Sequence, residues 1–310
     1  MTLYSHSGVI MAQATCALCK STNELQTSHI VPAFAVKYIK KTSLTEKFTS
    51  LENPNMTYQD GAKRKLLCGH CEQLMSEDEG WFAKNIFWPY VNSEARSFAY
   101  DYHLTRYCSA QSLRVLLYLE SKHAFLDSPD LNPSQRMKLA EAVDEFRQIT
   151  LLRARKPSRY QHHILFLDTA SDMGAKVPWL PKFLNHYMLR ALDSDCGVDS
   201  KRVLVYSKLA SIALFTFIYP RAPKKMTGTR IHGHGTIGTP QHVGDNGLAE
   251  FICSRAEVVS LIKDHESPKR QAKLARRFSN TKRPRMGSEY ERAAQADEVL
   301  RLLQQSGPEE

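Results

Sequence analysis

Two stretches in the middle of the chain carry the spacing of amphipathic helices. Over residues 109–126, the apolar side chains of Leu113, Leu116 and Leu117 fall on one helical face. Residues 132–154 open with Asn132, a plausible N-cap, and with proline at the first helical position. These patterns predict two helices inside a mainly helical segment that covers residues 93–190.

Shorter apolar stretches follow and have the composition of strands. They lie at residues 162–169, 201–207 and 249–254 and are bounded by polar or turn-forming residues. The longest apolar stretch, residues 203–220, is interrupted by Lys208 and by serines, and it falls short of the ~18–20 apolar residues that a membrane span needs. We interpret it as buried core, and the succession of helices and strands predicts an α+β fold.

Composition and charge narrow the class of protein. The chain has 310 residues, of which 42% are hydrophobic and 24% charged, as in ordinary globular proteins. The N-terminus has no basic segment followed by an apolar run, so we expect no secretory signal and a cytoplasmic protein. A net charge of +10 suits a polyanionic partner such as nucleic acid. The first 92 residues, however, carry nine Lys and Arg against eight Asp and Glu and are almost neutral.

Seven cysteines divide into two pairs and three isolated residues. Two Cys-x2-Cys pairs stand near the N-terminus, and the isolated thiols are expected to be small buried side chains. In a reducing compartment, paired spacing indicates metal or redox chemistry rather than disulfides. A structural Zn²⁺ takes four soft ligands at tetrahedral corners, and each short turn can supply two of them. The predicted zinc ligands are Cys16, Cys19, Cys68 and Cys71.

The residues around the second pair predict how this module folds. Gly69 gives the turn its backbone freedom, and the helix-forming stretch that follows places Cys71 in the first turn of a helix. Two ligands in a turn, a hairpin, and two ligands where a helix begins form a treble-clef arrangement. The 48 residues between the pairs then require a looped-out insertion. Two alternatives stay open: a thioredoxin-type redox pair, which would need a βαβ context, and replacement of one thiol by His70.

The order Cys-x2-Cys, Ser-His-Ile-Val-Pro, Cys-x2-Cys, from Cys16 to about Glu79, resembles the HNH (ββα-metal) nuclease family. It also resembles a set of uncharacterised bacterial proteins with the same pattern. The resemblance implies cleavage of phosphodiester bonds with one divalent metal ion and a histidine general base, here His29. A neutral imidazole can take a proton from water near pH 7. The alternative is a structural histidine that hydrogen-bonds inside a small zinc module.

The sequence departs from the family at the metal-binding positions. The residue before the histidine is usually Asp or His and is Ser28 here, and the residue after the last cysteine is usually Asn or His and is Glu72 here. Asp60 is the nearest substitute for the central Asn. Because Mg²⁺ and Mn²⁺ prefer carboxylate oxygen, Asp60 and Glu72, with Glu79 as a further candidate, could hold the ion beside His29. Alternatively, catalysis is lost, and the two carboxylates serve a turn and a helix N-terminus.

Clusters of basic residues are candidates for contact with nucleic acid, with DNA preferred over RNA. Such clusters supply affinity for phosphates rather than sequence choice, and a run of this kind can equally be a solvated arm. Residues 288–307, which follow the last of these basic clusters, have the pattern of an amphipathic helix that could pack on the rest of the protein or bind a protein partner. The candidate contacts are Lys63, Arg64, Lys65, Lys269, Arg270, Lys273, Arg276 and Arg277.

Two functional hypotheses follow. The first is a metal-dependent HNH-like endonuclease, with a role in bacterial anti-phage defence or as a toxin suggested by the resemblance alone. The second is a zinc-stabilised module that binds nucleic acid or protein without catalysis. Both hypotheses divide the chain into three segments: a zinc module at residues 1–92, an α+β region of unknown role at residues 93–262, and a basic arm with a helix at residues 263–310.

Overall fold

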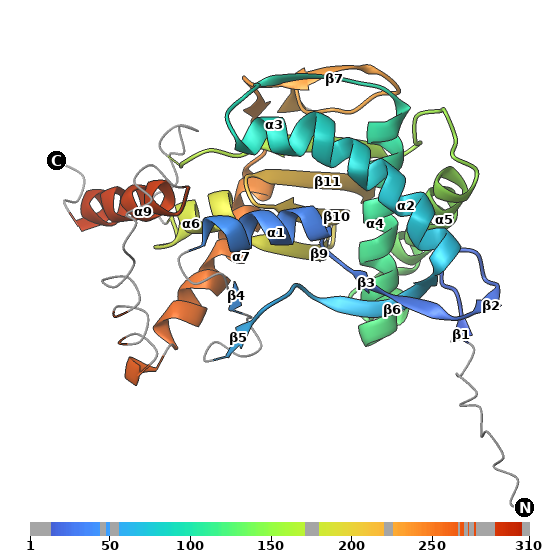
Figure 1. The fold of residues 1–310 in the computed structure, drawn as a ribbon, viewed down its shortest axis with the longest axis horizontal. Coiled ribbons are helices and arrows are strands. Elements are labelled where there is room, and N and C mark those ends of the chain that lie inside the picture. The colour runs from blue at the N-terminus through green and yellow to red at the C-terminus, as the bar shows by residue number, and fades with distance from the viewer. Residues whose placement is uncertain are drawn as a thin grey trace, which may run out of the picture.

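The computed structural model describes residues 14–43, 48–49, 56–170, 180–219, 226–265, 267–269, 272, 276 and 289–305. Within these residues the fold mixes helices and strands, which confirms the predicted α+β class (Figure 1). A four-stranded antiparallel sheet lies between two layers of helices, and a small N-terminal module with short strands packs at one end. None of the described helices is both long enough and apolar enough to cross a membrane.

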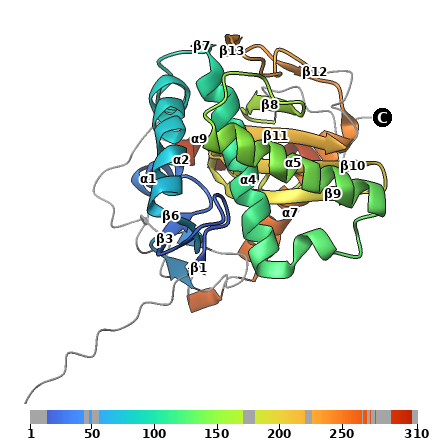
Figure 2. The ribbon, with the colours of Figure 1, turned by 90° about the vertical axis from the view of Figure 1, so that its right-hand side faces the viewer.

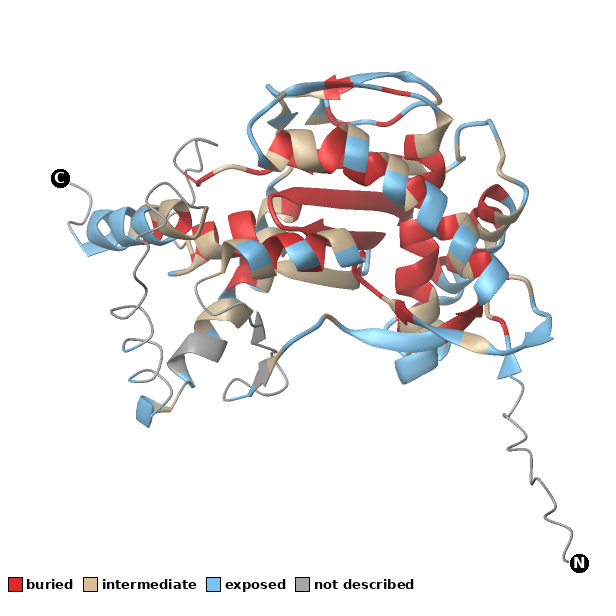
Figure 3. Cartoon of the chain, viewed as in Figure 1, coloured by how far each residue is buried: buried red, intermediate tan, exposed pale blue. Residues whose placement is uncertain are grey.

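The N-terminal module is built on a two-stranded ribbon with an insertion. Strand β3 pairs antiparallel with β6, and the insertion between them holds a helix and a two-stranded ribbon. The solvent-facing part of β6 is basic, whereas its last three residues are buried against the core (Figure 3). The elements are β1 (Ala14–Thr15), β2 (Thr22–Asn23), β3 (Leu25–His29), α1 (Ala33–Thr42), β4 (Phe48–Thr49), β5 (Thr57–Tyr58) and β6 (Lys63–Cys68).

A nearly continuous helix leads out of the module. Helix α2 (Gly69–Phe82) begins beside the second cysteine pair, as predicted, and runs through the π-helix η1 (Ala83–Phe87) into α3 (Trp88–Val91). Proline at position 89 has no N–H to give to the carbonyl four residues earlier, which favours a widened turn here. The side chain of Asn85 donates to the carbonyl of Trp81 at 2.8 Å and satisfies it.

Helix α4 (Tyr102–His123) is the central helix of the molecule and is buried along most of its length. Helix α5 (Pro133–Leu151) packs beside it, and Figure 2 shows both in front of the sheet. Asn132 and Gln135 form a reciprocal capping box, so the predicted N-cap is confirmed. The short strand β7 (Ser97–Tyr100) inside this segment was not predicted, and it pairs with β13 (Gly235–Gly238).

The sheet has the strand order β8-β11-β10-β9. Its strands are β8 (Gln161–Phe166), β9 (Leu192–Asp199), β10 (Arg202–Leu209) and β11 (Ile212–Tyr219). The predicted core stretch 203–220 forms β10 and β11, and these strands are apolar on both faces because helices cover both sides. Val203 and Val205 face the layer of α4 and α5, whereas Leu204 and Tyr206 face α6 (Leu184–Arg190) and α7 (Asn246–Asp264).

One predicted strand is wrong. Residues 249–254 lie inside helix α7, not in a strand. A short apolar run is compatible with either a helix or a strand, so the flanking residues determine which one forms. Here the carboxylate of Asp245 accepts the N–H of Leu248 at 3.0 Å and caps a long helix. The apolar residues Leu248, Cys253 and Ala256 then fall on the face that packs on the sheet.

The C-terminal helix α9 (Glu289–Gln305) packs on α6, which confirms the predicted helix. The carboxylate of Asp297 accepts the backbone N–H groups of Asn185 and His186 at 2.8 and 3.1 Å, at the N-terminus of α6. A carboxylate is favourable there because the helix N-terminus is electropositive. The strands β12 (Met226–Thr227) and β14 (His242–Val243) and the turn η2 (Phe125–Asp127) complete the described elements.

Two histidines on β8 are buried without charge. His162 hydrogen-bonds to Ser109 at 2.9 Å and to Thr216 at 2.7 Å. Burial, helped by the neighbouring His163, lowers the pKa of His162 to about 3, and burial lowers that of His163 to about 4. The unfolded chain therefore binds protons below pH 6.5 that the folded protein does not. The two neutral histidines therefore do not lower the free energy of unfolding above pH 6.5. That free energy declines as the pH falls from 6.5 toward the pKa values of the folded protein.

We predict that His162→Gln flattens the loss of stability in acid, because one buried imidazole costs roughly 1.4 kcal/mol per pH unit below its unfolded pKa. The measurement is the free energy of urea unfolding between pH 8 and pH 5. The control is His123→Gln at the exposed end of α4, which should leave the slope unchanged. Equal slopes for wild type and His162→Gln would contradict this account.

Candidate functional site

The four predicted cysteines lie together. Cys16 and Cys19 come from the turn between β1 and β2, Cys68 ends β6, and Cys71 lies in the first turn of α2. Their sulfur atoms all lie within 4.8 Å of one another. The backbone N–H of Cys68 donates to the sulfur of Cys16 at 3.3 Å, which ties the first turn to the end of β6. The cluster could hold a structural metal ion such as zinc.

The donor set fits zinc in type and spacing. A tetrahedral site with Zn–S bonds of about 2.3 Å places its sulfurs about 3.8 Å apart, and the sulfurs of Cys19 and Cys68 are 3.8 Å apart. A hydrogen bond from the side chain of Ser21 lowers the pKa of Cys19 to about 6, whereas burial raises the pKa of Cys68 and of Cys71. A thiol that resists ionisation in the absence of metal loses its proton when it coordinates a metal cation, and so becomes a good ligand.

His29 and Asp60 form a hydrogen-bonded pair on the outer face of the ribbon. The carboxylate of Asp60 accepts the Nε2–H of His29 at 2.7 Å and the backbone N–H of Gly61 at 2.9 Å. The second oxygen of Asp60 is 2.5 Å from the ammonium of Lys63. The side chains of His29 and Asp60 are 23% and 43% exposed, so solvent reaches both. Within the described parts of the chain, Nδ1 of His29 has no hydrogen-bond partner.

This arrangement fixes the charge of Asp60 and the ring nitrogen of His29 that carries a proton. Partial burial raises the pKa of Asp60, but the hydrogen bonds from Lys63 and His29 outweigh it and lower the pKa to about 2. Because an ionised carboxylate can only accept, Nε2 of His29 carries a proton, and in the neutral imidazole the lone pair is on Nδ1. The pair can therefore take a proton from a group that approaches Nδ1.

Ser28 points to the opposite, buried side of β3, since successive side chains of a strand alternate. Its hydroxyl donates to the carboxylate of Glu72 on α2. The guanidinium of Arg114 lies 3.8 Å from Glu72 and forms an ion pair with Glu79. Arg114 is only 4% exposed, and it was not predicted because nothing in the local sequence marks a buried charge on α4.

The positions predicted to bind a divalent metal are therefore divided between two faces. His29 and Asp60 meet on the outer face, and Glu72 meets Ser28 on the inner one. The carboxylates are already held by cations: Asp60 by Lys63, and Glu72 and Glu79 by Arg114. As folded here, the residues do not fit a Mg²⁺ or Mn²⁺ site, which needs carboxylate oxygens free to ligate.

The basic residues of β6 surround the outer face. In the register of the ribbon, Lys63 pairs with His29 and Lys65 with Thr27, so both lysines share the face of the imidazole. Arg64 is also exposed. Of the candidates in the basic arm, Lys269 and Arg276 are exposed, and Arg270, Lys273 and Arg277 lie outside the described residues.

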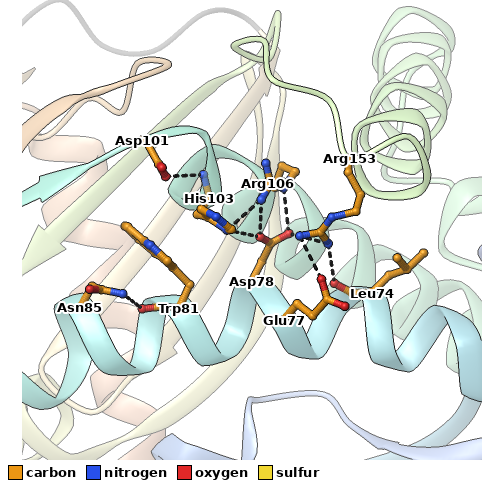
Figure 4. Close-up of polar contacts among 9 residues, drawn as sticks. All are labelled: Leu74, Glu77, Asp78, Trp81, Asn85, Asp101, His103, Arg106 and Arg153. Carbon is orange, nitrogen blue, oxygen red and sulfur yellow. Dashed lines mark hydrogen bonds and ion pairs between the residues drawn. The ribbon is translucent and has the colours of Figure 1, made fainter.

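A second polar cluster joins α2 to α4 (Figure 4). The buried carboxylate of Asp78 accepts two bonds from Arg106, at 3.1 and 2.8 Å, and lies 2.8 Å from His103 and 3.6 Å from Arg153. The ring of Trp81 stacks on His103 with centroids 5.5 Å apart. Sequence reasoning missed this cluster because Asp78 stands in an acidic run that looks solvated.

We predict that Asp78→Asn lowers the free energy of unfolding by about 3–5 kcal/mol, because it leaves the guanidinium of Arg106 buried without a charged partner. Glu77→Gln is the matched control: the side chain of Glu77 is 47% exposed, and a surface ion pair contributes only about 0–1 kcal/mol. Chemical denaturation of both variants at pH 7 measures the difference, and similar losses in both would contradict the assignment.

We predict one zinc ion per chain and its loss in Cys71→Ser, since a structural site loses most of its affinity with one ligand. Elemental analysis of the purified wild type and variant measures their zinc content, and thermal unfolding measures the stability that is lost with the metal. Cys253→Ser, which changes a buried cysteine outside the cluster, should retain the metal. A metal-free wild type, or zinc retained in Cys71→Ser, would contradict the prediction.

Comparison of this chain with protein-family models, with curated proteins and with solved structures finds no match. Two features of the structure bear on function: the cluster of four cysteines and the pair of His29 and Asp60.

Proposed function

We propose that this protein cleaves phosphodiester bonds in nucleic acid, through a zinc-stabilised treble-clef module of HNH type with His29 as general base. The observation that carries the proposal is the His29–Asp60 pair, which lies on the exposed face of a ribbon closed by four thiols. The order of the motifs along the chain and the start of α2 at the second cysteine pair agree with that type of module.

The chemistry assigned to each residue follows from its contacts. Asp60 orients the imidazole and stabilises the positive charge that forms when Nδ1 of His29 takes a proton from the attacking hydroxyl. Lys63 and Lys65, on the same face, provide positive charge for the phosphate. No other described side chain has a chemical role in this proposal. Glu72 is a positioning residue, because its contact with Ser28 holds β3 against α2.

The second candidate function is a zinc-stabilised module that binds nucleic acid or protein without catalysis. It is favoured by the direct contact of Ser28 with Glu72, since these are the positions at which the resemblance places metal ligands. A role in bacterial anti-phage defence or as a toxin stays a suggestion that rests on the resemblance alone.

We predict that His29→Ala reduces cleavage of nucleic acid by roughly 10²–10⁴-fold, the contribution of a general base. Asp60→Asn should reduce it as well, because an amide no longer fixes the Nε2–H tautomer. Plasmid DNA and a long RNA, each with and without Mg²⁺ or Mn²⁺, are the substrates. His123→Ala, which removes an exposed histidine on α4, is the matched control.

Cleavage that survives unchanged in His29→Ala would contradict the assigned base. Binding of the same substrates by wild type and His29→Ala alike, with no cleavage by either under any condition, would favour the second candidate. Retained zinc content in each variant shows that the module is intact.

A further inference from the structure

We infer that cleavage at this site needs no divalent cation and that its substrate is RNA, whose own 2′-hydroxyl attacks the neighbouring phosphate. The inference rests on the proposed function and adds the class of substrate and the source of the nucleophile. It follows from how the cationic side chains occupy the carboxylates around His29, and from the chemistry that a lone base and nearby lysines can perform.

Arg114 takes the place of a metal ion on the inner face. Its guanidinium lies between Glu72 and Glu79 and also donates to the sulfur of Met75 at 3.3 Å. Burial lowers its pKa, but the two carboxylates outweigh this effect and raise the pKa above its usual value, so the charge is permanent. A divalent cation at Glu72 would have to displace a buried guanidinium that has three partners, which is costly.

On the outer face, Asp60 is not free to bind a divalent cation either. One of its oxygens accepts from His29 and from Gly61, and the other lies against Lys63. To ligate a cation, Asp60 would have to release the imidazole that it orients. The described surroundings of His29 thus hold a base, a carboxylate that orients it and ammonium groups, but no carboxylate oxygen free for a metal.

These groups suit RNA better than DNA. In DNA the nucleophile is a water molecule, which must be both positioned and activated. In RNA the 2′-hydroxyl is already beside the phosphorus atom, and such intramolecular placement replaces much of what a metal ion would supply. A positioned general base and a cation beside the non-bridging oxygens are then sufficient for reaction.

The step is a transesterification. The 2′-hydroxyl gives its proton to Nδ1 of His29 and its oxygen bonds to phosphorus, while the bond from phosphorus to the 5′-oxygen breaks. The 5′-oxygen takes a proton from solvent water, and the hydroxide that remains is neutralised by the proton that His29 returns. The products are a 2′,3′-cyclic phosphate and a 5′-hydroxyl, and the positive charge of Lys63 faces the phosphate throughout.

The test compares three oligonucleotides of one sequence: RNA, fully 2′-O-methylated RNA and DNA. The full-length protein with its zinc content verified is used in buffer stripped of other divalent ions, with and without added Mg²⁺ or Mn²⁺. We expect cleavage of RNA alone, at a rate that Mg²⁺ does not raise, with 2′,3′-cyclic phosphate ends. His29→Ala, purified in parallel, should lose roughly 10²–10⁴-fold of this activity, and so excludes a contaminating ribonuclease.

A second readout does not depend on activity. Electron paramagnetic resonance of Mn²⁺ titrated into the wild type should show only free Mn²⁺ at millimolar concentration. In Arg114→Gln, which frees Glu72 and Glu79 from their cation, bound Mn²⁺ should appear. If that variant does not fold, the wild-type titration decides alone.

The outcomes separate the inference from the proposed function. Cleavage that requires Mg²⁺ or Mn²⁺, cleavage of DNA or of methylated RNA, or tight Mn²⁺ binding by the wild type overturns the inference and leaves the proposed phosphodiesterase standing. RNA cleavage that persists in His29→Ala overturns both. Absence of cleavage under every condition overturns the proposed function, and with it the RNA chemistry.

Discussion

The contact between the two cysteine pairs is the constraint on which the N-terminal module depends. Strands β1 and β2 have two residues each, and isolated two-stranded ribbons are marginal in water. The sulfurs join the turn between them to the end of β6 and the start of α2. A metal ion held there would fix the pairing of β3 with β6, and that pairing places His29 beside Asp60 and Lys63.

Helix α4 holds the residues on both sides of His29. The side chain of Gln111 donates to the carbonyl of Ile30 at 3.0 Å, and Arg114 contacts Glu72, which accepts from Ser28. The imidazole therefore projects from a strand whose two neighbouring positions are anchored to α4, a helix that is buried along most of its length. The general base proposed for this site is therefore held in position by its supporting contacts before any substrate approaches. The same contacts explain why Arg114 is charged although it is buried.

Much of the fold could be predicted, because local patterns determine it. The cysteine spacing predicted the cluster, Asn132 predicted the start of α5, and the apolar stretch 203–220 predicted buried core. Within that stretch a strand was predicted only at residues 201–207, which form part of β10, and β11 was not predicted as a strand. Strand β9 was not predicted because it is rich in Asp and contains a Gly, and it is held at the sheet edge by Arg255, which pairs with Asp193 and Asp195. The partners of Glu72 and Asp78 could not be predicted, since each depends on an arginine of α4 that is distant in sequence.

X-ray absorption at the zinc edge of the purified protein reports which atoms bind the metal in solution. We expect four sulfur ligands at about 2.3 Å and no nitrogen or oxygen ligand. Nitrogen or oxygen ligands, or fewer than four sulfurs, would contradict a site shared by the two cysteine pairs. The ribbon that carries His29 would then need another explanation for its position.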